Sequence, residues 1–353
     1  MRVLHVAEAL RGGVDTYLRG LLKYQQSQGV EVHLLVKEDV DWLPKEYVHH
    51  YDKGGRGFKS LFRLAKEYIR LVKRLEIDII HLHGTFAGFV CRMLKGISKD
   101  IPLIYCAHGW SYSKDGAFPS IYKSVEKCLS FFCDSVICIS HHDYQQSVAV
   151  KEKNVLVENA VEDTFYGNEP FATKKQLLFV GRFDRQKGLD ILLSAYKKSC
   201  VNYALVVVGE GVHNDTYIER NISGVEFKGW LKEAALKEEY LNSAAVIIPS
   251  RWEGFGLVAL EAMSASRMVI SSGVGGLKHL TEMSEGIIYS SEEELVSILK
   301  EFEKVPMKKL ELKGRIARSF YESNYSIEKM SNKIMQLYEV VVSKRNELQA
   351  QVE

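Results

Sequence analysis

The sequence predicts an α/β protein that contains two doubly wound, parallel-sheet domains. Short apolar runs typical of buried strands alternate with longer segments of helical periodicity along the chain. A polar, turn-rich stretch, 162–175, interrupts this alternation, and the same pattern then begins again. The 353 residues accommodate two domains of ordinary size, each with its own core.

The expected strands are short and apolar. In the first half they are Arg2–Val6, Glu31–Val36, Ile77–His83, Leu103–Ala107, Ser135–Ile139 and Val155–Val157. In the second half they are Gln176–Val180, Ala204–Val208, Val225–Phe227, Ala245–Pro249 and Met268–Ser271. The chain closes with an amphipathic helical segment, Ile327–Asn346. We therefore place one domain at 1–165, a second at 166–326, and a closing helical segment at 327–353.

The bulk composition fits a soluble, cytoplasmic protein. The 47 basic residues nearly balance the 45 acidic ones, so no bulk field attracts nucleic acid. The six cysteines show no C-x-x-C spacing, which favours reduced thiols over disulfides or a zinc site. The apolar run at the amino end is too short for a signal peptide, and no apolar stretch approaches membrane-spanning length.

Two carboxylates, Glu253 and Glu261, mark the most informative segment of the chain. Glu253 follows the apolar run Ala244–Pro249, and Glu261 lies about one turn into the helix predicted next. The carboxyl ends of strands form the usual ligand crevice of an open α/β sheet, and a helix start attracts anions. Gly254 and Gly256 let the backbone approach a ligand closely. The pattern suits a nucleotide-sugar, with one carboxylate for the sugar hydroxyls and one for a ribose.

A second motif has the character of a diphosphate site. Gly181 and Arg182 follow the strand-like run 177–180, and Lys187 and Gly188 precede a helical stretch. Arginine offers a fixed fork to phosphate oxygens, whereas lysine acts as a compact point charge. A strand, a glycine turn and two cations before a helix are what binding of a diphosphate requires.

In these motifs the chain resembles the retaining glycosyltransferases of family 4, which have the GT-B fold. The resemblance spans most of the chain. Further short motifs in the family's order are Gly12-Gly13, His81-Leu82-His83-Gly84, His108-Gly109, Ile139-Ser140, Asn159-Ala160-Val161, Val225-Glu226-Phe227-Lys228-Gly229 and Gly275-Gly276. The chain departs from the family at Ala160, at Ser266-Arg267-Met268 and at Lys278-His279, positions that bear on the pocket's shape.

The resemblance implies two Rossmann-like domains facing a central cleft, with the closing helix crossing back onto the first domain. It implies that Arg182 and Lys187 hold the donor's diphosphate, and that His108 contacts the donor sugar. A phosphate nearby would tend to raise the pKa of that histidine. The implied catalytic residues are Glu253, His108, Arg182 and Lys187. The implied donor-binding residues are Gly12, Gly13, Gly181, Arg182, Lys187, Trp230, Glu253, Gly254, Phe255, Gly256, Leu257 and Glu261.

The family's reaction transfers a sugar with retention of its anomeric configuration, and no side chain is named here as a covalent nucleophile. We expect no cofactor and no metal. Asp39-Val40-Asp41 has the form of a cation-binding D-x-D motif but reads as an ordinary polar loop. His81 and His83 share one strand face, and no third ligand accompanies them in the sequence, which favours a structural pair.

The expected donor is a UDP-hexose or UDP-N-acetylhexosamine, with GDP-sugars next. The expected acceptor is a lipid-linked glycan of a surface polysaccharide, O-antigen or capsule. Rival functions are a nucleotide-sugar epimerase or hydrolase on the same fold, and a non-catalytic nucleotide-sugar-binding protein. A dinucleotide-dependent oxidoreductase is disfavoured because Gly209-Glu210-Gly211 lacks the third glycine of G-x-G-x-x-G.

The segment 56–74 predicts an amphipathic helix. Its basic face comprises Lys59, Arg63, Lys66, Arg70, Lys73 and Arg74. Its apolar face comprises Leu61, Phe62, Ala65, Tyr68, Ile69 and Val72, and we expect this face to pack on the sheet. The basic face can then approach anionic lipid headgroups, which predicts a peripheral position on the inner face of the plasma membrane.

Overall fold

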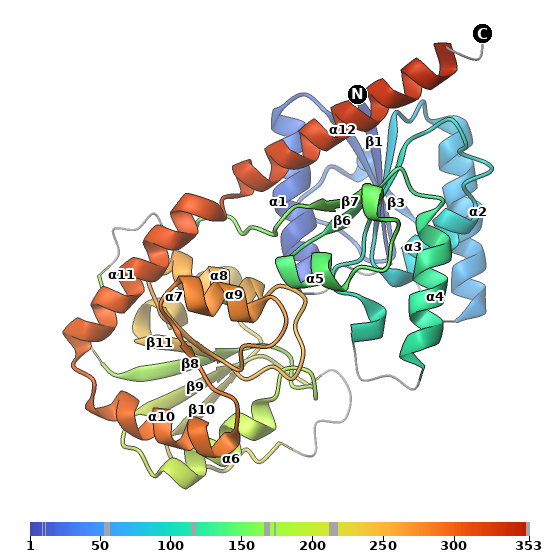
Figure 1. The fold of residues 1–353 in the computed structure, drawn as a ribbon. Coiled ribbons are helices and arrows are strands. Elements are labelled where there is room, and N and C mark those ends of the chain that lie inside the picture. The colour runs from blue at the N-terminus through green and yellow to red at the C-terminus, as the bar shows by residue number, and fades with distance from the viewer. Residues whose placement is uncertain are drawn as a thin grey trace. The chain divides into compact units, whose positions relative to one another are not determined.

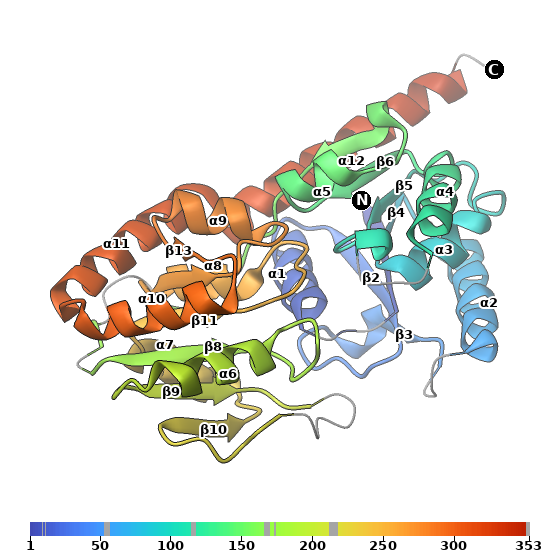
Figure 2. The ribbon, with the colours of Figure 1, turned by 60° about the horizontal axis from the view of Figure 1, so that its bottom comes forward.

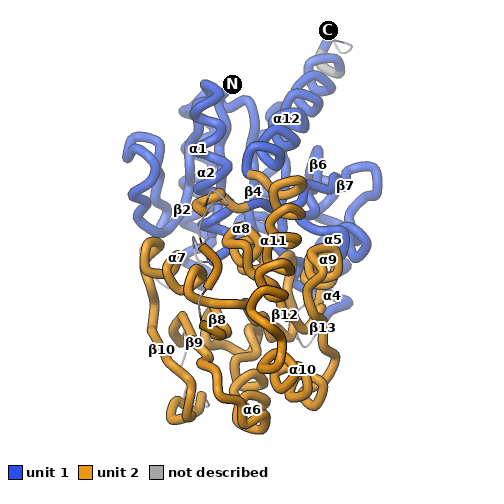
Figure 3. Tube along the Cα trace, turned by 90° about the vertical axis from the view of Figure 1, so that its left-hand side faces the viewer, with its two compact units in different colours: residues 1–160, 327–353 blue, residues 161–326 orange. Residues whose placement is uncertain are grey.

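The structure, a computed structural model, describes residues 1–350 except 9, 11, 53–56, 114–117, 166–169, 173 and 212–217. The chain forms two compact units (Figures 1 and 3). Unit 1 comprises 1–160 together with 327–353, and unit 2 comprises 161–326.

Unit 1 contains a sheet of seven parallel strands in the order β3-β2-β1-β4-β5-β6-β7. The strands are β1 Arg2–Ala7, β2 Glu31–Val36, β3 Val48–His50, β4 Ile79–His83, β5 Leu103–Cys106, β6 Ser135–Cys138 and β7 Asn154–Leu156. The helices are α1 Gly13–Ser27, α2 Phe58–Arg74, α3 Thr85–Met93, α4 Pro119–Ser130, α5 His141–Gln146 and α12 Ile327–Ala350.

Unit 2 contains a sheet of six parallel strands in the order β10-β9-β8-β11-β12-β13 (Figure 2). The strands are β8 Gln176–Val180, β9 Ala204–Val208, β10 Val225–Gly229, β11 Ala245–Ile248, β12 Met268–Ser271 and β13 Ile287–Ile288. The helices are α6 Leu189–Ser199, α7 Glu233–Asn242, α8 Leu257–Ser264, α9 Leu277–Met283, α10 Glu292–Lys304 and α11 Met307–Asn324.

The predicted fold class is confirmed, because both sheets are parallel throughout and have helices on both faces. Each predicted strand is present. The structure adds β3 and β13, which have three and two residues and are too short to produce a recognisable apolar run.

Side-chain alternation along β1 explains how the helices of unit 1 divide between the faces of its sheet. Leu4 and Val6 join the apolar core that α2 and α3 cover. His5 points to the opposite face and bonds Gln25 of α1. On that same face His81 of β4 bonds the hydroxyl of Tyr338, so α12 belongs to the core of unit 1.

The two connections between the units lie side by side. Val161 and Ser326 form a parallel β-bridge, and the Tyr321 hydroxyl donates to the Val161 carbonyl at 3.0 Å. Arg318, only 8% exposed, pairs with Asp163 in the same region. These contacts hold the segment at 161–163 against the segment at 318–326.

Helix α2 begins at Phe58 rather than 56, and Arg56 lies outside the described residues. The predicted basic face is exposed along its length. The predicted apolar face is wrong at Phe62, which is 73% exposed. The most buried residues are Ser60, Leu64, Tyr68 and Leu71. The other predicted residues, Leu61, Ala65, Ile69 and Val72, pack against the same core and are partly buried.

Candidate functional site

The loops that follow β8, β9 and β11 in unit 2 touch through glycines. Gly188 has φ +66°, and a Cβ placed there would lie 2.0 Å from the Pro249 carbonyl oxygen. Gly209 is equally constrained, since its Cβ would lie 1.8 Å from the carbonyl oxygen of Gly181. Only glycine permits this approach of backbone to backbone. The carboxyl ends of the three strands therefore form one edge, where a ligand of a parallel sheet is expected.

The loop after β12 supports the same edge. A Cβ at Gly275 would lie 1.9 Å from the Glu253 carbonyl oxygen, and one at Gly276 would lie 2.7 Å from that of Gly254. The Gly275-Gly276 pair thus fixes the backbone that carries the Glu253 side chain.

Lys187 and Glu253 meet at the centre of this edge. Lys187 Nζ lies 2.8 Å from Glu253 Oε2, and the two side chains are 18% and 13% exposed. The Ser250 hydroxyl donates to the same carboxylate oxygen at 3.2 Å. Partial burial strengthens a charged contact relative to one on the surface, and the pair holds both groups in place.

Arg182 lies in the same loop as Lys187 but remains 41% exposed. Its guanidinium donates to Gln186 Oε1 at 3.0 Å and pairs with Asp184 at 3.0 Å. The Gln186 side chain in turn donates to the Trp252 carbonyl at 3.1 Å. Arg182 is therefore oriented by its own loop and still open to an incoming anion.

A further ion pair, unrecognised in the sequence, joins the β11 loop to α6. Arg251 forms a two-pronged contact with Asp190, at 2.8 and 2.6 Å. The Arg251 amide also donates to the Gln186 carbonyl at 2.8 Å. Hydrogen bonds from Arg251 lower the pKa of Asp190, so this brace stays ionised at neutral pH.

Glu261 lies in the second turn of α8, which begins after Gly256, a residue with φ +105°. The hydroxyl of Tyr240 on α7 donates to Glu261 Oε2 at 2.6 Å. Burial raises the pKa of Glu261, while the Tyr240 hydrogen bond and the charge of Lys187 lower it. Phe255, beside Gly254, is buried and anchors the loop.

Trp230 follows β10 at the same edge and is 64% exposed. Its amide donates to Glu210 Oε1 at 3.2 Å, which joins the β9 loop to the β10 loop. The structure thus gathers Gly181, Arg182, Lys187, Glu253, Glu261 and Trp230 on one sheet edge, from the loops after β8, β10 and β11 and from helix α8. Sequence reasoning missed Gln186, Asp190, Glu210 and Tyr240, because their partners lie on other elements.

The predicted site residues of unit 1 have different surroundings from those of unit 2. Gly12 has φ +60° and precedes α1, and both it and Gly13 are exposed. The amides of Asp15 and Thr16 donate to the Gly12 carbonyl, so these residues are the first turn of the helix. Among the described residues, no side chain caps this end.

A hydrogen-bonded row of histidines leads from the interior of unit 1 to His108. The distances are 2.9 Å from Gln25 Oε1 to His5 Nε2, 3.0 Å from His5 Nδ1 to His83 Nε2, and 3.1 Å from His83 Nδ1 to His108 Nε2. His5 and His83 are buried, whereas His108 is half-buried. The ring of Tyr17 contacts His108 edge-on at 4.7 Å.

These rings are uncharged near neutral pH. Burial lowers the pKa of His108 and of His5 to about 4, and it also lowers the pKa of His83. Burial within unit 1 therefore acts opposite to the direction expected from a nearby phosphate. His108 also has φ +54°, a left-handed conformation that is uncommon for a residue with a Cβ.

The pair His81 and His83 has a third histidine beside it, contrary to our expectation. One ring nitrogen of each of His5, His81 and His83 lies within 4.8 Å of the others. Neutral imidazoles so grouped are a donor set that zinc accepts. Here the ring nitrogens of His5 and His83 are already engaged with Gln25, His108 and each other. His81 Nδ1 bonds the Tyr338 hydroxyl, and His81 Nε2 is buried without a hydrogen-bond partner among the described residues.

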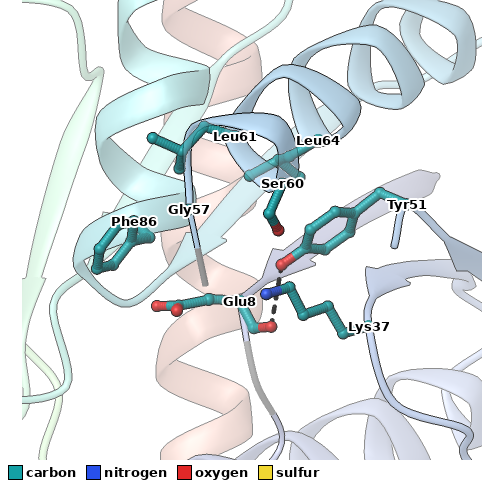
Figure 4. Close-up of a pocket in the computed structure, with 8 residues that line it drawn as sticks. All are labelled: Glu8, Lys37, Tyr51, Gly57, Ser60, Leu61, Leu64 and Phe86. Atoms are coloured by element: carbon teal, nitrogen blue, oxygen red, sulfur yellow. Dashed lines mark hydrogen bonds between the residues drawn. The ribbon is translucent and has the colours of Figure 1, made fainter. Parts of the chain in front are cut away.

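A small pocket lies in unit 1 at the start of α2 (Figure 4). It is lined by Glu8, Lys37, Tyr51, Gly57, Ser60, Leu61, Leu64 and Phe86. The Tyr51 hydroxyl donates to the Glu8 carbonyl at 3.0 Å, and Lys37 Nζ lies 5.7 Å from the Tyr51 ring. Glu8 follows β1, so the pocket lies at the carboxyl edge of the sheet.

Comparison with known families identifies the chain. Residues 162–339 match the model of glycosyl transferases group 1, and residues 11–165 match that of glycosyltransferase family 4. The chain belongs to the glycosyl transferases group 1 family. The predicted family is confirmed, and the protein is a glycosyltransferase with the GT-B fold.

Two relatives of this glycosyltransferase match most of the chain. An uncharacterised 41.2 kDa protein in the cps region of Klebsiella pneumoniae is 31% identical over 310 residues, 81% of this chain and 84% of that protein. The O-antigen biosynthesis glycosyltransferase WbnH of Escherichia coli is 27% identical over 281 residues, 76% of this chain and 80% of WbnH.

Solved structures share the fold of this glycosyltransferase at low sequence identity. A sucrose-phosphate synthase from Thermosynechococcus elongatus superposes with a TM-score of 0.85 at 20% identity. The match covers 98% of this chain and 100% of the synthase chain. Anabaena HepE in complex with UDP-glucose superposes with a TM-score of 0.80 at 18% identity, covering 96% and 100%. Across the described residues, no helix is both long and apolar enough to cross a bilayer.

Proposed function

We propose that this glycosyltransferase moves a sugar, with retention of its anomeric configuration, from a nucleotide diphosphate sugar to a hydroxyl of a lipid-linked surface glycan. The observation that carries the proposal is the Lys187–Glu253 pair at the carboxyl edge of the unit 2 sheet. A cation and a carboxylate held 2.8 Å apart offer one group to a diphosphate and one to sugar hydroxyls.

In the proposed complex the diphosphate takes over Lys187 and Arg182, which releases Glu253 to accept hydrogen bonds from the sugar. Glu261 accepts from the ribose hydroxyls, and Trp230 lies beside the base. The backbone N–H groups at the start of α8 add positive potential. We also propose that His108 and the Gly12-Gly13 amides contact the donor. His108 would act as a neutral hydrogen-bonding group.

The proposed reaction needs no enzyme nucleophile. The bond from the anomeric carbon to the diphosphate oxygen breaks, and its electron pair leaves with the diphosphate. The acceptor hydroxyl bonds to the same face of the oxocarbenium-like sugar, and its proton passes to a departing phosphate oxygen. Arg182 and Lys187 stabilise the charge that develops on the diphosphate. The proposal includes no divalent metal, because these two cations and the helix start supply positive charge.

Donor and acceptor classes follow from relatives. HepE, named above, was solved with UDP-glucose, which supports a UDP-hexose ahead of a GDP-sugar. The relation to WbnH supports a glycan acceptor of the O-antigen type. For that acceptor we propose the pocket at Glu8, because a carboxylate, a lysine and aromatic rings are groups that recognise a sugar.

We further propose that unit 1 approaches an anionic membrane through α2. All six predicted basic residues of this helix are exposed. Each contributes on the order of 1 kcal/mol near an anionic surface. Weak binding to vesicles of anionic lipid at low salt, lost as salt is raised, is the expected behaviour of such charges.

The test is a panel of nucleotide-sugars measured by thermal stabilisation, followed by product analysis with and without acceptor. We expect a UDP-hexose to stabilise most and to be consumed at a significant rate only when a glycan acceptor is present. Proton NMR of the product should show the donor's anomeric configuration. Fast consumption of donor alone would instead favour a hydrolase or epimerase, and binding without turnover under any condition would favour a nucleotide-sugar-binding protein.

A further inference from the structure

Helix α4 in unit 1 carries its apolar stripe on the outside. Phe118, just before the helix, and Ile121, Tyr122 and Val125 within it recur at the spacing of one helix face. They are 63%, 58%, 46% and 37% exposed, respectively. A surface helix normally turns such a stripe to the core, so this orientation requires an explanation.

A buried ion pair fixes the orientation of α4. Arg92 of α3 lies 2.8 Å from Glu126 of α4, and the two side chains are 1% and 5% exposed. The Arg92 guanidinium also lies over the Tyr105 ring at 3.8 Å and donates to the Gly88 carbonyl. Turning the stripe inward would expose or separate this pair, and separating a buried pair is strongly destabilising.

The exposed apolar surface extends from α4 to its neighbours. The stretch 58–132 contains twelve of the eighteen large hydrophobic side chains that are exposed among the described residues, so the clustering is not an average surface property. Besides Phe118 and the three on α4, they are Phe58, Phe62, Phe86, Phe89, Met93, Ile97, Phe131 and Phe132. Helices α2, α3 and α4 lie side by side in Figures 1 and 2.

The charges on these helices are basic. On α4, Lys123 and Lys127 are exposed, whereas Glu126 is buried against Arg92. On α2, six basic residues are exposed, and Glu67 is paired with Arg70. Aromatic and aliphatic side chains between lysines match a partner that is anionic at its surface and apolar beneath. Two copies of this chain packed through the same face would instead oppose like charges.

We propose that α4, the exposed side of α3 and the first turns of α2 form one insertion surface, which enters the interfacial layer of an anionic bilayer. This inference deepens the membrane association proposed through α2 and rests on it. Association through α2 and insertion of this surface differ in their response to salt. The lysines of α2 act at a distance and are screened by salt, whereas buried aromatic side chains hold the protein at high salt.

The test compares vesicles of phosphatidylcholine with and without phosphatidylglycerol, at low and high salt, by co-sedimentation of the full chain. The variant Ile121→Ser/Val125→Ser removes apolar area without adding charge. The matched control is Leu312→Ser, on α11 in unit 2, which is 59% exposed. We expect the double variant to lose about a hundredfold in binding, roughly tenfold for each side chain. The control should bind as the native protein does, and circular dichroism should show all three proteins folded.

A second readout reports insertion directly. Tyr122→Trp places an indole in the stripe, and we expect lipids brominated near the headgroup to quench its fluorescence more than lipids brominated near the acyl end. No quenching, or equal quenching by both brominated lipids, would contradict insertion at this depth.

The outcomes separate the two proposals. If the double variant binds like the native protein and all binding vanishes at high salt, the insertion surface is wrong while association through α2 stands. If the native protein binds neither vesicle, both are wrong. If the stripe instead mediates a concentration-dependent dimer that the double variant abolishes, the surface is a contact between copies and the inference is overturned.

Discussion

The carboxyl edges of the two sheets share one architecture but differ in charge at the residues predicted to bind the donor. In unit 2 the edge carries ion pairs, Lys187 with Glu253 and Arg251 with Asp190, on loops locked by glycines. In unit 1 the edge carries His108, at the end of a row of rings that burial keeps neutral. At the predicted site residues, one Rossmann-like frame thus supports paired charges in unit 2 and a neutral ring in unit 1.

The difference indicates a division of labour. A diphosphate carries negative charge and requires cations, whereas a hexose is neutral and is recognised by hydrogen bonds. Charged loops suit the diphosphate of a nucleotide-sugar, and neutral imidazoles suit its hexose or the acceptor. If this comparison is sound, variants in unit 2 should act through charge and variants in unit 1 through hydrogen bonding.

The largest effect is expected for Glu253→Gln. This change keeps the shape of the side chain but removes the charge that faces Lys187 and the sugar. We expect kcat to fall by about a hundredfold or more, as when one group that stabilises a transition state is lost. Donor affinity, measured by calorimetry with UDP-glucose, should change little. A kcat within a few-fold of the native value would exclude Glu253 from the chemistry.

Lys187→Gln should mainly weaken donor binding. A charged hydrogen bond to phosphate is removed, which corresponds to roughly ten- to a hundredfold in affinity for UDP. Arg185→Gln, two residues away in the same loop, is the matched control and should lose less than threefold, roughly. Equal losses in both variants would mean that the loop attracts UDP by bulk charge, which contradicts a specific site.

Gly188→Ala tests whether the loops of unit 2 must touch. The new Cβ would meet the Pro249 carbonyl in a left-handed residue, and we expect a loss of about 3 kcal/mol in the free energy of unfolding. Gly29→Ala is the matched control, because Gly29 has φ +74° but nothing within 4 Å of the added atom. It should cost only about 1 kcal/mol. Urea denaturation measures both, and similar losses would refute the close approach.

Tyr240→Phe should change the pH dependence of donor binding. The Tyr240 hydrogen bond lowers the pKa of Glu261, so its loss raises that pKa further above the ordinary value. The ionised carboxylate then persists over a narrower range, and the acid limb of the affinity profile moves to higher pH. We expect a loss of roughly fivefold on that limb and little change at pH 8.

The control for this variant is Tyr289→Phe. Tyr289 is also buried in unit 2, and its hydroxyl has no hydrogen-bond partner among the described residues. Its removal should leave the pH profile unchanged. If the two variants behave alike, the Tyr240–Glu261 bond does not set the ionisation of Glu261.

The smallest effect is expected in unit 1, where the ionisation state of His108 should not change with pH. With a pKa of about 4, His108 stays neutral from pH 8 down to about pH 5.5. The NMR signal of its ring, assigned with His108→Gln, should therefore not shift across that range. A titration near pH 6.5 would show that the ring is solvated and would break the contrast between the units.

Much of the fold was predictable because buried parallel strands read as apolar runs bounded by turns. The donor-loop residues were predictable for a related reason, since Gly181 to Gly188 and Glu253 to Glu261 are continuous in the sequence. Strands β3 and β13 were not, because two or three residues produce no pattern.

Long-range pairing could not be predicted. Tyr240 is an ordinary helical tyrosine until α7 is placed against α8, and His5 belongs to the row of histidines only because β1 lies beside β4. The orientation of α4 was equally hidden. Periodicity locates an apolar stripe, but the Arg92–Glu126 pair decides that the stripe of α4 faces outward.

The central claim is that the charged edge of unit 2 binds the diphosphate of a nucleotide-sugar. Hydrogen–deuterium exchange with and without UDP tests it most directly. We predict that UDP slows exchange in the peptides covering 181–188 and 253–261 by at least about tenfold, and that Lys187→Gln sharply reduces this protection at the same UDP concentration. Protection confined to other peptides, with these two unchanged, would contradict the account.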